Sequence, residues 1–297
     1  MEAASAPAPR LSLRRRRRLL PYILLGPGLL WLIVFFAVPA LLQWQVSLWS
    51  GSLETGYAFD WNWSSYGEAF GDYKEQFLRS FAFAGAATIL AFVISFPLAY
   101  FIAFKAGRFK NLMLLLIVLP FFTSYLVRTV AWQTILADGG FAVNALQSVG
   151  IVSEGGRLLA TTTSVVAGIT YNFLPFMALP LYVSLEKIDK RLIEAATDLY
   201  ASRWAAFRKV TLPLALPGIF AGSLLTFIPA AGDFINAQLL GGPQQSMIGN
   251  VIQSKFLVIT DYPAAAAMSF ILMGVILAAV LLYARALGAR TLTESAV

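Results

Sequence analysis

Few residues of this chain can support catalysis, because its 297 residues include no cysteine and no histidine. Thiol nucleophiles, zinc sites built from Cys and His, and Ser-His-Asp triads are therefore excluded. No lysine is followed by serine or threonine, so the sequence also lacks the G-x-x-x-x-G-K-[ST] loop that holds nucleotide phosphates. The remaining chemistry is that of carboxylates, basic side chains and aromatic rings, which bind and position charged groups.

Two ionisable residues stand alone within long apolar stretches. Arg128 is the only charged residue between Lys110 and Asp138, and Asp233 is the only one between Lys209 and Lys255. Ionised groups in a membrane-spanning segment usually face the interior of a helix bundle or an aqueous cavity. Two interpretations stay open at this point. Either Arg128 and Asp233 pair with each other or reach water near a helix end, or they line the path of a solute.

The composition is typical of a protein embedded in lipid. The chain is 59% hydrophobic and 12% charged, with a mean hydropathy of +0.72, whereas a soluble domain is roughly half apolar and about a quarter charged. Four charge-free stretches can each hold the roughly 20 apolar residues of a spanning helix, and the segments around Arg128 and Asp233 add two more. We therefore predict an all-α integral membrane protein with six transmembrane helices. The charge-free stretches lie between Arg18 and Glu54, Arg79 and Lys105, Arg157 and Glu186, and Asp261 and Arg285.

The distribution of basic residues predicts the orientation. Most of the 22 Lys and Arg residues lie in alternate connecting segments, namely 1–18, 105–110, 187–209 and from 285 onward. The positive-inside rule makes these segments, and hence both termini, cytoplasmic. Because topology accounts for the net charge of +7, we expect no nucleic-acid partner. The expected parts are a disordered basic tail at 1–18, a transmembrane domain at 19–290 and a short tail at 291–297.

The cytoplasmic loop between the fourth and fifth predicted helices, residues 186–212, exceeds the usual 2–8 residues of a helix connection. Its apolar residues recur at helical spacing between charged ones, which predicts one or two short amphipathic helices along the membrane face. These helices either anchor the loop at the lipid headgroups, with Trp204 and Arg203 at that level, or dock a cytoplasmic partner. The recurring residues are Leu192, Ala196, Leu199, Tyr200, Trp204 and Phe207.

The sequence of this loop adds a more specific indication. The stretch EAATDLYASRWAAFRKVTLPLALPG, residues 194–218, resembles the signature loop of permease subunits of binding-protein-dependent ABC importers. Tyr200 departs from the family pattern, which has a glycine there that bends the loop between two short helices. The resemblance implies that the loop docks an ATPase through Glu194, Ala195, Ala196, Asp198, Tyr200, Ala201 and Phe207.

The resemblance extends over about residues 120–242 and is strongest to the spermidine/putrescine permeases of this family. The similar stretches are PFFTSYLVRTVAWQTIL, GGFAVNALQSVGI, YNFLPFMALPLYVSLEKID and FIPAAGDFINAQLLGG. Under this resemblance Asp233 suits a polyamine cation on the outer path, with Tyr171, Phe227 and Phe234 lining the route. A structural role is favoured for Arg128, because an arginine on the path would repel a cation.

The resemblance also implies the partners and the cofactor. We expect a second homologous permease, a cytoplasmic ATPase dimer that carries ATP and magnesium, an extracytoplasmic binding protein, and the lipid of a bacterial-type inner membrane. This chain itself would bind no cofactor and would be a transport subunit rather than an enzyme. A family relative for an opine, an aminophosphonate or ferric ion is the alternative to a polyamine permease.

Two further classes of protein fit the sequence less well. A self-contained secondary carrier or channel often shows repeated halves and an intramembrane ion relay, but this chain shows no convincing internal repeat and only two ionisable groups in its spans. An intramembrane aspartyl protease needs two facing carboxylates, and only Asp233 lies in a predicted span. Serine chemistry with a lysine base is unsupported, since every lysine falls outside the spans.

Overall fold

The computed structural model describes residues 24–150, 153, 155–199 and 202–294, and the side chains of all of these except 286–294. The structure is helical, with five helices long and apolar enough to cross a membrane and one bent helix pair that makes a sixth span if counted as one. This confirms the predicted all-α membrane class. The five continuous candidates are Leu24–Val46, Ser64–Phe104, Thr162–Glu186, Arg203–Ala231 and Tyr262–Arg285.

The first span ends in a short hairpin that the sequence analysis did not predict. A π-helical turn, Ile33–Ala37, leads into α2 (Val38–Val46), and two antiparallel strands follow, β1 (Trp49–Ser52) and β2 (Gly56–Phe59). Gly51 and Gly56 have φ angles of +113° and +81°, which a residue with a Cβ atom adopts only with strain. The glycines therefore allow the tight reversal between two spans.

The span expected between residues 110 and 138 is not one straight helix. It consists of α4 (Lys110–Val118), a 3₁₀ turn (Leu119–Phe122) and α5 (Tyr125–Leu136), and the chain bends by 95° at the break. Pro120 lacks a backbone N–H, and Thr123 takes an extended conformation, so the α-helical hydrogen-bond ladder stops there. After α5, α6 (Phe141–Ser148) completes the bent arm.

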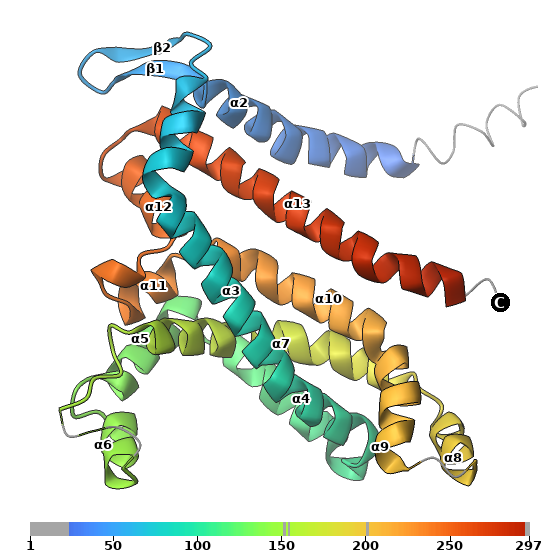
Figure 1. Ribbon diagram of the computed structural model, residues 1–297. Coiled ribbons are helices and arrows are strands. Elements are labelled where there is room, and N and C mark those ends of the chain that lie inside the picture. The colour runs from blue at the N-terminus through green and yellow to red at the C-terminus, as the bar shows by residue number, and fades with distance from the viewer. Residues whose placement is uncertain (1–23, 151–152, 154, 200–201, 295–297) are drawn as a thin grey trace, which may run out of the picture.

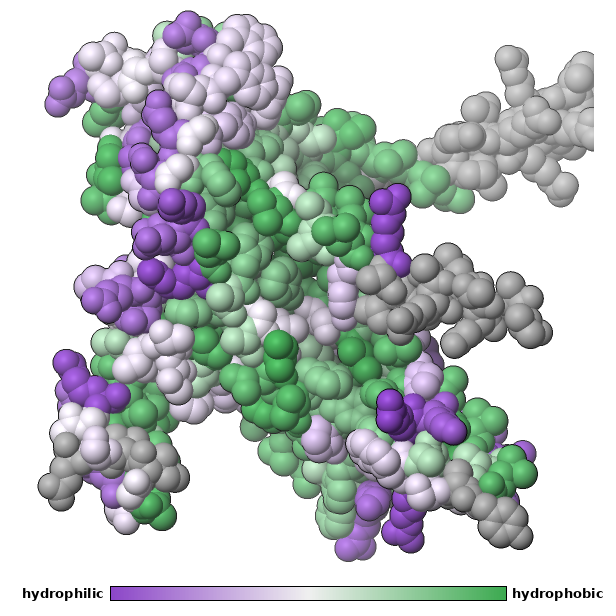
Figure 2. Space-filling model, in the orientation of Figure 1, coloured by the Kyte–Doolittle hydropathy of each residue, from purple (hydrophilic) through white to green (hydrophobic). Residues whose placement is uncertain are grey.

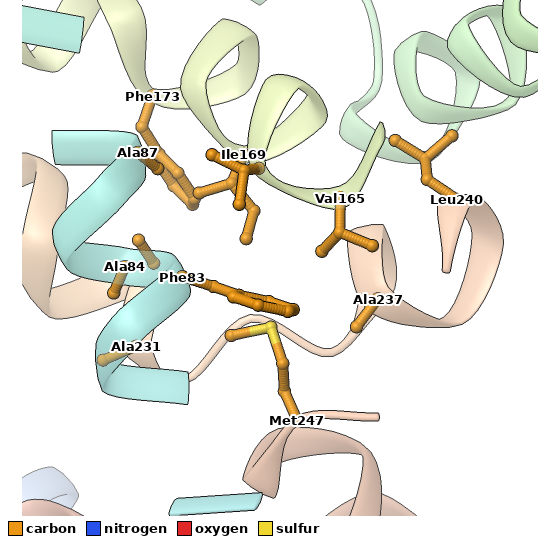
Figure 3. Close-up of a cluster of buried hydrophobic side chains, with 12 residues drawn as sticks. Phe83, Ala84, Ala87, Val165, Ile169, Phe173, Ala231, Ala237, Leu240 and Met247 are labelled. Atoms are coloured by element: carbon orange, nitrogen blue, oxygen red, sulfur yellow. The ribbon is translucent and has the colours of Figure 1, made fainter. Parts of the chain in front are cut away.

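Three long helices form the centre of the bundle: α3 (Ser64–Phe104), α7 (Thr162–Glu186) and α10 (Leu212–Ala231). Phe83, Ala84 and Ala87 of α3 face Val165, Ile169 and Phe173 of α7 within one buried apolar cluster (Figure 3). Small residues permit this close packing, because a Cβ atom added at Gly218 of α10 would lie 2.7 Å from the carbonyl oxygen of Pro180 in α7. The centre is thus fixed by shape as well as by burial of apolar surface.

The remaining elements complete the two ends of the molecule. The short helices α8 (Lys190–Asp198) and α9 (Arg203–Ala206) follow α7, and α11 (Ile235–Leu240) and α12 (Ile248–Leu257) separate α10 from α13 (Tyr262–Glu294). The start of the Leu24–Val46 helix and the end of α13 lie on the same side as α8 and α9, opposite the hairpin and α12 (Figure 1). Hydrophobic residues cover the middle of the visible face, and hydrophilic ones gather at these two ends (Figure 2).

Candidate functional site: the α8–α9 loop and a buried polar cluster

Helix α8 presents one face outward. Asp189 caps its first turn, because the carboxylate accepts a hydrogen bond of 3.0 Å from the backbone N–H of Arg191. Glu194, Ala195 and Asp198 are exposed, and Ala196 is half-buried. Two turns of this helix therefore offer carboxylates beside small residues, an arrangement that allows another backbone to approach closely and donate hydrogen bonds.

The opposite face of the loop is fixed to the membrane helices. Ile193 of α8 and Phe207 pack against a buried cluster formed mainly by the C-terminal halves of α3 and α7. The ring of Phe207 meets Phe96 edge-on at 5.7 Å and Tyr100 at 6.3 Å, both on α3. The α8–α9 loop is therefore in direct contact with the core of the bundle.

Helix α9 is the first turn of the fifth span rather than a separate element. The Ser202 hydroxyl caps it by accepting a hydrogen bond from the N–H of Ala205, and helical structure continues through a π-helical turn, Phe207–Thr211, into α10. Trp204 stacks on Phe207 at 5.4 Å and is 69% exposed. Both the headgroup interpretation and the docking interpretation accommodate this exposure. Tyr200 and Ala201 lie outside the described residues.

Asp233 lies in the turn between α10 and α11, where it organises a buried polar cluster. The residue is 7% exposed, and one carboxylate oxygen accepts the backbone N–H groups of Ile235 and Asn236 at 2.9 and 3.2 Å. The other accepts the hydroxyl of Tyr125 at 2.7 Å and the side-chain amide of Asn236. Four donors thus satisfy this carboxylate.

The cluster continues to α7 and to a second residue of α5. The side-chain amide of Asn172, on α7, donates to the side chains of Asn236 at 3.1 Å and Thr129 at 3.2 Å. Among the described residues Arg128 forms no salt bridge with Asp233. The structure therefore ties α5, α7 and α11 together through neutral hydrogen-bond partners, and the carboxylate needs no arginine because four donors already surround it.

The structure does not gather the predicted path residues into one cavity. Tyr171 and Arg128 line a cavity of about 350 Å³ between α3, α4, α5 and α7. Phe227 lines another, of about 400 Å³, between α3, α10 and α13. Phe234 lines a third, of about 810 Å³, beside α2, α12 and α13. Of the five predicted path residues, the fifth of which is Asp233, only Tyr171 and Arg128 share a cavity.

Sequence reasoning missed the neutral members of the polar cluster. Tyr125, Asn172 and Asn236 lie within stretches that the sequence analysis compared with known permeases, but only ionisable groups were counted as unusual in a span. An amide in the middle of an apolar helix is the signal that could have found them, since a buried amide requires hydrogen-bond partners. Ile193 was missed because the helical pattern was read from Leu192 and Leu199, which are 50% and 81% exposed.

Two thirds of the chain matches a known protein family. Residues 95–292 match the family described as "Binding-protein-dependent transport system inner membrane component". The chain belongs to this family. The match includes both the α8–α9 loop and the polar cluster, and it makes this inner membrane component a multi-pass protein of the inner membrane. Its relatives are subunits of transport systems, which accords with a role in transport rather than catalysis.

Three bacterial permeases are similar in sequence to this inner membrane component. It is 38% identical over 257 residues to the spermidine/putrescine transport system permease protein PotB of Haemophilus influenzae, covering 86% of this chain and 90% of that protein. The Escherichia coli PotB is 40% identical over 214 residues, with 72% and 78% covered. The inner membrane ABC transporter permease protein YdcU of E. coli is 36% identical over 224 residues, with 71% of each covered.

Solved structures support the fold of this inner membrane component. A chain of a bacterial ABC transporter involved in the import of the acidic polysaccharide alginate matches with a TM-score of 0.66 and 20% identity, covering 93% of this chain and 98% of that chain. The alginate transporter in complex with an alginate pentasaccharide-bound periplasmic protein matches with a TM-score of 0.67, also at 20% identity, covering 93% and 96%. This inner membrane component therefore shares its fold with a chain of each of these two structures.

Proposed function

We propose that this chain is a permease subunit of an ATP-driven importer and forms half of the path of a polyamine, spermidine or putrescine. The observation that carries the proposal is the 38% identity to a spermidine/putrescine permease over 86% of the chain. The identity to a spermidine/putrescine permease favours a polyamine over an opine, an aminophosphonate or ferric ion. A self-contained carrier is disfavoured by the same identity.

The proposal includes four partners. A second homologous permease completes the path, a binding protein delivers the polyamine from outside, lipid surrounds the spans, and a cytoplasmic ATPase dimer carries ATP and magnesium. One solved relative is in complex with a periplasmic protein, which supports the binding-protein partner. Both termini are proposed to be cytoplasmic, as the positive-inside rule predicts; the described ends lie on the same side as α8 and α9 (Figure 1), which supports this proposal.

The α8–α9 loop is the proposed contact with the ATPase. Its exposed carboxylates and small residues provide the docking face, and Ile193 and Phe207 fix that face to α3 and α7. Closure of the ATPase dimer then moves α8 and, through the continuous helix from α9 to α10, the fifth span. The two permeases rock against each other and expose the path to alternate sides of the membrane.

A charge reversal tests the docking contact. Glu194→Lys replaces an exposed carboxylate on α8, and Glu54→Lys makes the same change on the exposed hairpin turn at the opposite end. We expect Glu194→Lys to lose the ATPase subunits on affinity purification of the complex, or to hydrolyse ATP without response to substrate, while Glu54→Lys retains the ATPase. Equal recovery of ATPase subunits and equal substrate-stimulated turnover in both variants would refute the docking role.

The substrate is tested by uptake in cells. Cells that lack this chain should take up less radiolabelled spermidine or putrescine, and expression of the chain should restore uptake. Excess unlabelled polyamine should compete, whereas an opine, an aminophosphonate or a ferric complex should not. Unchanged polyamine uptake in cells that lack this chain, together with reduced uptake of one of these other solutes, would retain the permease assignment and reject the polyamine.

A further inference from the structure

The cavity shared by Arg128 and Tyr171 has an unusual lining for its position. The cavity has a volume of about 350 Å³, and most of its wall is formed by apolar residues of α3, α4 and α7, including Leu98, Leu116 and Leu174. The only charged group in the wall is the guanidinium of Arg128. A cation in an apolar cavity is costly unless an anion or several hydrogen-bond acceptors accompany it.

Arg128 has no such companion among the described residues. The side chain is 9% exposed, and its Nε atom is buried without a hydrogen-bond acceptor. The guanidinium carbon lies 4.7 Å from the ring centre of Phe121 and 5.7 Å from that of Tyr125. These rings hold the cation in place, but they do not accept the directional N–H bonds of its fork. Asp233 is engaged with four other donors.

The depth of the cavity limits what can reach it. Leu174 is near the middle of α7, a helix of 25 residues that is about 37 Å long at 1.5 Å per residue. The cavity therefore lies near the mid-length of a candidate membrane span, away from both ends of the helix. Lipid phosphates remain at the surface, and a polyamine is itself a cation. An acidic side chain of an adjoining membrane helix can reach the cavity and carries the negative charge that Arg128 requires.

We propose that the cavity receives a carboxylate, Asp or Glu, from the second permease subunit, and that this carboxylate pairs with Arg128 in the assembled transporter. The proposal rests on the proposed function, which supplies the second permease. Leu116, in the wall of the cavity, is 55% exposed, so this wall is accessible to a helix of another subunit. The planar fork of arginine suits a two-point contact with a carboxylate. Arg128 is thus a residue for subunit assembly.

Stability and assembly should respond in opposite ways to loss of this charge. Arg128→Gln removes a buried, unpaired cation from the isolated chain, so the thermal unfolding midpoint of that chain should stay unchanged or rise. In the complex the same variant leaves the partner's carboxylate buried and unpaired, so recovery of the second permease on affinity purification should fall by about tenfold or more. Arg157→Gln, which removes an exposed arginine paired with Asp138, is the matched control and should leave recovery unchanged.

The outcomes separate this inference from the proposed function. If the wild-type chain recovers no second permease, the proposed function fails. If the wild-type chain and Arg128→Gln recover equal amounts, the inference alone fails.

Photo-cross-linking identifies the occupant of the cavity. A photoreactive amino acid in place of Leu116 should yield, in membranes that contain the whole complex, an adduct with a transmembrane peptide of the second permease that contains Asp or Glu. The same probe in place of Leu225, which is exposed on α10 and lies outside this cavity, should not label that peptide. Labelling of lipid only, or of a peptide without an acidic residue, would overturn the proposal.

Discussion

Removal of the Tyr125 hydroxyl tests whether Asp233 holds helices together. In Tyr125→Phe the ring keeps its place, but the carboxylate of Asp233 loses its 2.7 Å hydrogen bond, and Asn236 loses an acceptor at 2.6 Å. Hydrogen bonds to charged groups stabilise a protein by about 1.5–3 kcal/mol when buried. We therefore expect the free energy of unfolding to fall by about that amount.

Tyr171→Phe is the matched control for this prediction. Tyr171 is also a half-buried tyrosine, and its ring packs against Trp132 at 5.3 Å. Its hydroxyl forms no side-chain hydrogen bond among the described residues, so its removal should change the free energy of unfolding by less than about 0.5 kcal/mol. The two substitutions delete the same atom and differ in the bonds that the atom makes.

Thermal unfolding of the purified chain in detergent measures the difference, and the seven tryptophans report it through their fluorescence. At about 2 °C per kcal/mol for a chain of this length, Tyr125→Phe should lower the unfolding midpoint by about 3–6 °C. If Tyr125→Phe and Tyr171→Phe unfold at the same temperature, the cluster around Asp233 does not hold the helices together. The interpretation of Asp233 as a path residue would then regain its weight.

Two further predictions concern packing and coupling. Gly218→Ala should destabilise the chain by about 1–3 kcal/mol, because the added Cβ would lie 2.4 Å from the Cβ of Ser184. In the control variant Gly274→Ala the added Cβ meets no atom within 4 Å, so this change should be neutral or stabilising by up to about 1 kcal/mol. Thermal unfolding measures both variants, and equal midpoints would contradict the close packing of α7 and α10. Ile193→Ala should lower uptake several-fold while ATP hydrolysis continues, because α8 loses the side chain that packs against the bundle. The control variant Leu192→Ala keeps that side chain and should transport normally. Uptake and hydrolysis are measured on the same reconstituted complex, and an equal ratio of uptake to hydrolysis in the two variants would contradict this role of Ile193.

The spans were predictable because ionised side chains are excluded from hydrocarbon. The five continuous helices and the bent pair correspond to the six segments marked by the gaps between charges. The 95° bend was not predicted, because a proline in a membrane helix usually causes only a kink. In this chain Pro120 is followed by the extended residue Thr123, and the helix stops instead of continuing.

The candidate site was only partly predictable, because charge and periodicity are local features of the sequence and do not show which distant segments meet in the fold. The loop pattern predicted one or two short helices, and the described residues hold α8 as a separate helix, with α9 as the first turn of the fifth span. It did not show that Ile193 is the inner anchor, since this depends on the position of α3 and α7 around the loop. Likewise Asp233 was identified from its charge, but its partner Tyr125 lies 108 residues away in the chain, and only the folded bundle joins them.

The central claim is that an ATPase holds α8 and drives this permease. Photo-cross-linking from position 194 in membranes of cells that are importing polyamine tests this claim most directly. We expect a photoreactive residue in place of Glu194 to form an adduct with an ATPase subunit, and the yield to change when ATP is trapped in the closed dimer. Adducts with lipid alone, while uptake proceeds at the normal rate, would show that the ATPase does not hold α8.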